Sequence, residues 1–150
     1  SLYKRKLRAL PKVRYCFSFE MRSKKQAIDY HLVFASQHPL GLEKMKEAMR
    51  TIDQDGSYCF SDDSVGQHSL FRFNDPATHA KQMADYFRGQ SVAYAAVNDY
   101  ALNESPFSNP KKMLKALEDA GLIVVTAARA RKKGTFPEDA QTGMRITFNM

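Results

Sequence analysis

The sequence predicts an α+β fold in which an N-terminal β-hairpin and a helix are followed by a mainly helical region that closes on a second hairpin. Two patterns carry this prediction. In the first third of the chain, apolar and polar residues alternate with a period of two, as they do along half-buried strands. Near the C-terminus, a short helical pattern ends at a glycine and is followed by two apolar stretches that flank a basic loop.

The period-two pattern covers residues 13–21 and 28–36, with a polar connection between them. Each of these strands would have one aromatic face, and an isolated two-stranded hairpin is not stable in water. Apolar spacing after Pro39 predicts an amphipathic helix that ends at Ile52 and could cover the aromatic face. The alternative is a homodimer, in which a second copy buries that face.

The middle of the chain predicts a linker and then two helices. Residues 53–69 are polar and turn-rich, and a short strand could follow at 69–73. Asp75-Pro76 is an N-cap and first-turn pair that predicts a helix ending at Gly89. The run 92–102 is apolar on nearly all sides and predicts a short helix buried between others.

The C-terminal pattern begins with Asn109-Pro110, in which asparagine suits the N-cap and proline the first helical position. A helix with apolar residues on one stripe would run from there to Gly121. Strands at 122–126 and around 144–148 complete the outline. The inward-facing residues of this helix would be Met113, Leu114, Leu117 and Ala120.

A helix followed by a hairpin with a cationic tip is the outline of a winged helix-turn-helix. The predicted organisation is therefore a hairpin, helix and linker over residues 1–68, followed by a winged helix-turn-helix over 69–150. Winged helices are one of the architectures that place a helix in a nucleic-acid groove, so nucleic acid is the first partner to consider.

The net charge of +7 is unevenly distributed along the chain. Residues 1–25 contain nine Lys or Arg and one Glu, whereas residues 26–107 contain six Lys or Arg and eleven Asp or Glu. Basic ends around an acidic middle predict a localised contact with phosphates. Alternatively, the charge serves solubility alone.

The helix after Pro110 has its charges arranged against its own dipole. Lys111, Lys112 and Lys115 lie in its first half, and Glu118 and Asp119 lie near its end. Lysines beside the free amides of a helix N-terminus would suit a phosphate backbone, although they could also be an ordinary solvent-facing side. No further side chain on the helix is suited to reading a base edge, so we expect weak sequence preference.

The loop between the last two strands carries the stronger signal. Arg129, Arg131, Lys132 and Lys133 would lie at the hairpin tip, where a wing meets a groove or its flanking phosphates. The alternative is a solvated loop. With the helix lysines, these residues form the predicted phosphate-contact set for nucleic acid, with duplex DNA as the expected target and RNA left open.

Several other classes of protein are not indicated. No apolar run reaches the roughly 20 residues of a membrane span, and no apolar segment follows the basic N-terminus as in a signal peptide. Cys16 and Cys59 form no CxxC pair and suggest thiols in a reducing cytoplasm. The histidines show no metal-ligand spacing, and no glycine-rich phosphate loop is present. We therefore expect no metal site, cofactor or catalytic residue in this chain.

Several blocks resemble the C-terminal half of the three-Cys-motif partner proteins of bacteria. They are residues 30–36, 38–45, 104–107, 117–118, Gly121 and 132–137, and together the resemblance extends over most of the chain. It implies a methyltransferase-type Rossmann domain followed by a winged helix-turn-helix. It also implies association with a radical-SAM-like protein as partner.

On this resemblance the hairpin would be the last two strands of a methyltransferase-like sheet. The cofactor-binding strands of such a fold would precede residue 1, so no cofactor or catalytic residue is carried over. Two alternatives to nucleic-acid binding stay open. The chain could be a protein-docking module anchored at Thr135-Phe136-Pro137, or a fragment of a methyltransferase-like protein whose catalytic half lies upstream.

Overall fold

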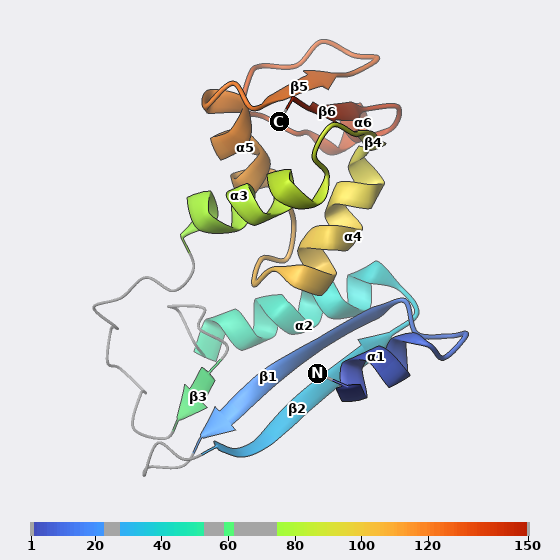
Figure 1. Ribbon diagram of the computed structural model, residues 1–150, viewed down its shortest axis with the longest axis vertical. Coiled ribbons are helices and arrows are strands. Elements are labelled where there is room, and N and C mark those ends of the chain that lie inside the picture. The colour runs from blue at the N-terminus through green and yellow to red at the C-terminus, as the bar shows by residue number, and fades with distance from the viewer. Residues whose placement is uncertain (1, 23–27, 53–58, 62–74, 150) are drawn as a thin grey trace. The chain divides into compact units, whose positions relative to one another are not determined.

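The computed structural model describes residues 2–22, 28–52, 59–61 and 75–149 (Figure 1). It has the predicted α+β class, and the chain divides into two compact units. Unit 1 comprises Ser1–Asn74 with Leu102–Ser108, and unit 2 comprises Asp75–Ala101 with Asn109–Met150. The predicted domain boundary at residue 68 and the predicted strand at 69–73 lie outside the described residues.

Unit 1 contains the predicted hairpin. Strands β1 (Tyr15–Arg22) and β2 (Ile28–Ser36) are antiparallel, with Phe17 opposite Phe34. A short strand, β3 (Cys59–Ser61), pairs in parallel with β1, so the sheet order is β2-β1-β3. The prediction of a linker over 53–69 was wrong at β3. A three-residue strand has no readable period, and its pairing with a distant strand is what defines it.

Helix α2 (Pro39–Ile52) packs on the aromatic face of this hairpin, as predicted (Figure 1). Phe19 and Met49 form one buried cluster, and Leu42 with Tyr15 belongs to a second. At the outer part of β2, Tyr30 and Leu32 are exposed. Cover by α2 within one chain is therefore confirmed for the inner part of the face, and the homodimer stays a prediction.

Residues 102–108 are held in unit 1 by Lys46 of α2, which has no exposed surface. Its Nζ donates to the backbone oxygens of Leu102 (2.6 Å), Ser105 (2.6 Å) and Phe107 (3.1 Å). The same atom lies 4.3 Å from the centre of the Phe17 ring. An ammonium group has three protons to donate, one for each of these carbonyls. Burial nevertheless lowers the pKa of the Lys46 amine well below its ordinary value.

A further helix, α1 (Leu2–Arg8), was not predicted, because its charged residues interrupt the apolar pattern. None of its residues is buried, and it contacts β1. Polar contacts rather than a hydrophobic stripe therefore hold it in place, and only the folded chain shows them.

Unit 2 begins with α3 (Pro76–Tyr86), capped by the Asp75 carboxylate, which accepts a hydrogen bond from the amide of Ala77 at 3.2 Å. Its inward side is the predicted one, and the helix ends before Gly89, where φ is +68°. The left-handed conformation suits glycine, so this helix was readable from sequence. Its buried residues, with the one following its end, are Ala80, Met83, Ala84 and Phe87.

The predicted helix over 92–102 begins later and is preceded by a strand. Residues of β4 (Ser91–Ala93) pair with the last strand, and α4 (Tyr94–Glu104) follows directly. The helix is not buried all round, because Ala95 and Ala96 are exposed. A short apolar run does not distinguish strand from helix, and here pairing with a distant strand decides.

The remaining elements are α5 (Lys111–Asp119), β5 (Ile123–Thr126), α6 (Glu138–Gln141) and β6 (Arg145–Phe148). Strand β6 lies between β4 and β5 and is antiparallel to both. The four-residue α6 was not predicted. The observed order in unit 2 is helix, strand, helix, helix, strand, short helix, strand. It is compatible with a winged helix-turn-helix, and that assignment stays a prediction.

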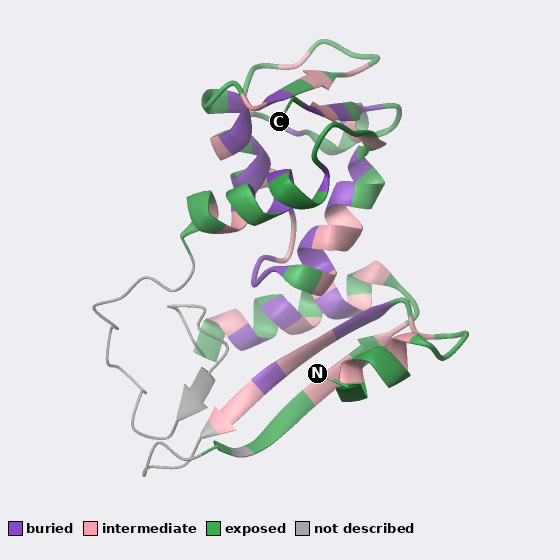
Figure 2. Cartoon of the chain, viewed as in Figure 1, coloured by how far each residue is buried: buried purple, intermediate pink, exposed green. Residues whose placement is uncertain are grey.

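The core of unit 2 lies along one side of α5, whose buried residues are purple in Figure 2. Met113, Leu114 and Leu117 are buried as predicted, and Met144, Ile146 and Phe148 are buried at β6. Ala120 is exposed, so its predicted place on the inner stripe was wrong. The helix ends at Asp119, and Ala120 lies beyond the last regular turn.

Candidate nucleic-acid interface

The N-terminus of α5 is built as the sequence predicted. The Asn109 side-chain oxygen accepts a hydrogen bond from the amide of Lys111 at 3.1 Å, and the Pro110 carbonyl accepts from Leu114 at 2.9 Å. Asn109 is therefore the functional cap, and Pro110 takes a helical conformation. No acidic residue lies in the first turn, so Lys111 and Lys112 add to the positive end of the helix dipole.

The other end of α5 holds the wing, defined here as residues 127–137 between β5 and α6. The Glu118 carboxylate is buried and accepts from both terminal nitrogens of Arg131, Nη2 to Oε1 and Nη1 to Oε2, the second at 3.2 Å. The amide of Gly134 donates to the same Oε2 at 2.7 Å. A bidentate arginine–carboxylate pair fixes orientation as well as distance, so it ties the wing to α5 in one geometry.

Arg131 also organises the wing internally. Its Nη1 donates to the backbone oxygen of Thr135 at 3.2 Å, and its guanidinium lies 5.1 Å from the centre of the Phe136 ring. Phe136 is 4% exposed and stacks towards Tyr94 with ring centres 6.5 Å apart. Since Phe136 is covered in this way, it is not available as the surface anchor that the protein-docking alternative requires.

Gly134 is where the wing turns back towards α5. Its φ is +76°, and a Cβ atom added there would lie 3.3 Å from Cγ of Lys115. The left-handed backbone favours glycine, and a Cβ there would also push the Lys115 side chain aside. The hydroxyl of Thr135 donates to the backbone oxygen of Lys132 at 2.6 Å and closes the turn.

The electrostatics of Glu118 favour its ionised form. Burial raises the pKa of this carboxyl, but the hydrogen bonds from Arg131 and the Gly134 amide, with nearby Lys133, outweigh burial and hold the pKa below its ordinary value. The wing anchor is therefore an ion pair at neutral pH. Nearby Asp119 also has a lowered pKa, because Lys115 donates to it.

The seven cations that the sequence singled out fall into two groups. Lys115 pairs with Asp119 at 2.6 Å, Arg129 with Asp139 at 3.5 Å, and Arg131 with Glu118. Within the described residues, the other four form no ion pair. These four are Lys111, Lys112, Lys132 and Lys133. A phosphate-contact role for any of the seven stays a prediction.

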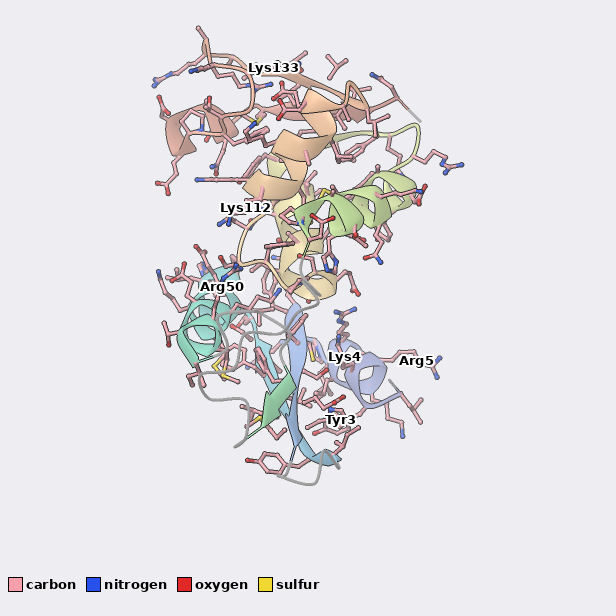
Figure 3. All side chains as sticks on the ribbon, turned by 90° about the vertical axis from the view of Figure 1, so that its left-hand side faces the viewer. Tyr3, Lys4, Arg5, Arg50, Lys112 and Lys133 are labelled. Atoms are coloured by element: carbon pink, nitrogen blue, oxygen red, sulfur yellow. The ribbon has the colours of Figure 1, made fainter. Side chains whose placement is uncertain are left out.

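The unpaired cations form two clusters at opposite ends of α5, as Lys112 and Lys133 show in Figure 3. From Lys112 to Glu118, which holds the wing, the helix rises about 9 Å at 1.5 Å per residue. The grooves of B-DNA are about 6 and 12 Å wide. A stretch of α5 of the same order as a groove width therefore lies between the Lys112 end of the helix and the residue that anchors the wing.

Sequence reasoning missed the role of Glu118. A signal for it was present, because Glu118 lies four residues after Leu114 and one after Leu117, on the buried stripe of the helix. An acidic residue on a buried stripe requires a cationic partner. Arg145 on β6 was also overlooked. It is exposed and donates to the backbone oxygen of Ser91 at 2.7 Å.

Across the described parts of the chain, no group of three or more His, Cys, Asp or Glu side chains is arranged to hold a metal ion. No helix among these residues combines the length and apolar character that crossing a bilayer requires.

Comparison with known proteins gives no relative. No family model matches the chain, and neither the curated proteins nor the solved structures contain a match.

Proposed function

We propose that unit 2 is a winged helix-turn-helix that binds nucleic acid, with duplex DNA as the expected target, and that it acts without catalysis. The observation that carries the proposal is the pair of unpaired cation clusters at the two ends of α5, one of them on a wing whose root is fixed by Glu118 and Arg131. Fixing the wing root lowers the entropy lost when the wing cations meet phosphates.

In this proposal the cations have different roles. Lys111 and Lys112 contact phosphates together with the amides of the α5 N-terminus, and Lys132 and Lys133 contact the backbone across the groove. Arg131 is a positioning residue, since its charge is balanced by Glu118. Lys115 and Arg129 pair with exposed carboxylates and can exchange partners at small cost, because such surface pairs contribute only about 0–1 kcal/mol.

This division predicts the salt dependence. The salt slope is the slope of the logarithm of the binding constant against the logarithm of the salt concentration. At 0.9 per phosphate contact on B-DNA, four contacts give a slope of about −3.6 and six give about −5.4. None of the proposed contacts reads a base edge, so random-sequence duplexes should bind about equally well.

The test is fluorescence-anisotropy titration with random duplex DNA, duplex RNA and single strands at two salt concentrations. The Lys132→Ala/Lys133→Ala variant should reduce the duplex slope by about 1.8. Its control is Lys44→Ala/Arg50→Ala on α2, which removes the same charge from unit 1 and should leave the slope unchanged (Arg50 in Figure 3). Absence of duplex binding at low salt would refute the proposal and favour a docking role.

A radical-SAM-like partner, implied by the three-Cys-motif resemblance, is a separate proposal. Co-purification of such a protein with the chain would support it, and the Lys132→Ala/Lys133→Ala variant would show whether capture uses the same surface.

A further inference from the structure

Unit 1 presents a second cationic surface that unit 2 does not explain. Residues 1–14 contain six Lys or Arg and no Asp or Glu. Most of them lie on α1 and on the turn that follows it. The backbone bond from Val13 to Leu10, at 3.1 Å, closes that turn, which carries Lys12.

Helix α1 is held to unit 1 by an arginine. Arg8 pairs with Glu104 at 2.6 Å and donates to the backbone oxygens of Asn103 (3.1 Å) and Cys16 (3.3 Å). Four residues earlier, Lys4 lies 5.3 Å from the centre of the Phe17 ring. Residues four apart share one side of a helix, so Lys4 and Arg8 mark the side that faces the rest of the unit.

The other sides of α1 are open: Tyr3 and Lys6, three residues apart, share one of them, and Arg5 lies on another. Arg5 and Lys6 are exposed, as is Lys12 in the turn, and none of the three forms an ion pair with another residue that the structure describes. Tyr3 is 60% exposed on the same helix. In Figure 3 the Arg5 side chain extends outward from α1. A helix held on its inner side by Arg8 thus displays two cations and an aromatic ring.

Exposed cations beside an exposed aromatic ring suit one class of partner. Single-stranded nucleic acid offers phosphates for the cations and unpaired base faces for the ring, and it needs no sequence match. An anionic membrane surface is less suited, because interfacial helices bind through a broad apolar face. Here the apolar Leu7 is partly covered, and cations lie between the exposed Leu2 and Tyr3 and the exposed Leu10, so no broad apolar face forms.

We propose that the outer side of α1 and the following turn bind single-stranded nucleic acid. Arg5, Lys6 and Lys12 contact the backbone, and Tyr3 stacks on a base. This surface is formed by unit 1 alone and does not depend on the wing. It would let the chain hold a single strand in addition to the duplex proposed for unit 2.

The experiment measures anisotropy of an oligo(dT) probe of about 16 nucleotides, and of a random duplex, with the whole chain. Arg5→Ala/Lys6→Ala/Lys12→Ala should lower the single-strand salt slope by about 2, at 0.7 per contact. Tyr3→Ala should weaken single-strand binding by about 5- to 150-fold, the range for one base stack, and Tyr3→Phe should restore it. Duplex binding should not respond to Tyr3→Ala.

The control is Lys44→Ala/Lys81→Ala/Arg88→Ala, which removes three exposed positive charges elsewhere and should leave the single-strand slope unchanged. The proposal is overturned if the α1 triple variant behaves like this control, or if Tyr3→Ala has no effect. The proposal is also overturned if the α1 triple variant loses binding to phosphatidylserine vesicles but keeps its binding to the oligonucleotide. That result would assign the surface to a membrane.

The test of the α1 surface can fail or succeed independently of the test of nucleic-acid binding by unit 2. If Lys132→Ala/Lys133→Ala leaves all binding intact while the α1 variants lose single-strand affinity, the inference stands and the proposed function of unit 2 fails. The reverse result sustains unit 2 and rejects the α1 surface.

Discussion

The ion pair between Glu118 and Arg131 should be the main electrostatic contribution to the stability of unit 2. Their side chains are 10% and 9% exposed, respectively, and Glu118 also accepts from the Gly134 amide. Glu118→Gln keeps the shape but removes the charge, and it places an NH2 group against N–H donors. Removing one member of a buried pair costs about 3–5 kcal/mol. In Glu118→Gln, Arg131 keeps two backbone acceptors in the wing, so we expect the free energy of unfolding to fall by about 3 kcal/mol, the lower end of this range.

Urea unfolding measures this cost. With a slope of about 2 kcal/mol per molar, a loss of 3 kcal/mol lowers the unfolding midpoint by about 1.5 M. Arg131→Gln should cost a similar amount, whereas the double variant should be much less destabilised than the sum. We expect a coupling energy of at least about 2 kcal/mol, because two amides can bond to each other and no charge is left unpaired.

The comparison variant is Lys115→Ala, which breaks the neighbouring exposed pair with Asp119 and should cost less than about 1 kcal/mol. Single costs that add to within about 0.5 kcal/mol in the double variant would refute the reasoning, since independent residues behave in that way. Binding gives a second check. Under the proposed function, Arg131→Gln should weaken duplex binding without changing the salt slope, because the proposal gives Arg131 a positioning role and no phosphate contact.

Three further predictions follow from the same structure. Folding lowers the pKa of Glu118, so the stability that its ionised form contributes is present above its unfolded pKa and is lost as pH falls through the folded pKa. Melting temperatures measured between pH 7 and pH 3 should therefore fall below about pH 4.5. In Glu118→Gln this part of the pH dependence should be absent. Lys46→Met should lower the free energy of unfolding by about 3 kcal/mol, because three backbone carbonyls lose their donor; an unchanged urea midpoint would contradict this. Gly134→Ala should lower the free energy of unfolding, measured by calorimetry, by about 1–2 kcal/mol, because φ is positive at this position. The comparison is Gly41→Ala inside α2, where φ is negative and the added Cβ would crowd the Ser36 side chain.

The local sequence pattern was sufficient to predict most of the helices and strands. The hairpin, α2 and α3 follow from strict periodicity and from capping residues that act within a few positions of themselves. The same is true of α5, where the Asn109 cap and the stripe of Met113, Leu114 and Leu117 were readable. Such signals are local, because a period or a cap depends only on neighbouring residues.

Apart from the short helix α6, the elements that were missed depend on distant partners. Strands β3 and β4 are three residues each and exist through pairing with β1 and β6. Helix α1 has no buried residue and is held by Arg8, whose partners Asn103 and Glu104 lie far along the chain. No pattern within any of these three segments indicates such a partner.

The sequence by itself determined the α+β class, the order of the main helices and strands, and the candidate cations of the interface. Only the tertiary structure decided which cations are paired, because an ion pair depends on side chains brought together by folding. It separated Arg131, bound to Glu118, from Lys132 and Lys133, which remain exposed one and two residues later. It also brought the Lys46 ammonium to three backbone carbonyls more than fifty residues away. Periodicity reports which face of an element is apolar, whereas charge pairing is a property of contacts between elements.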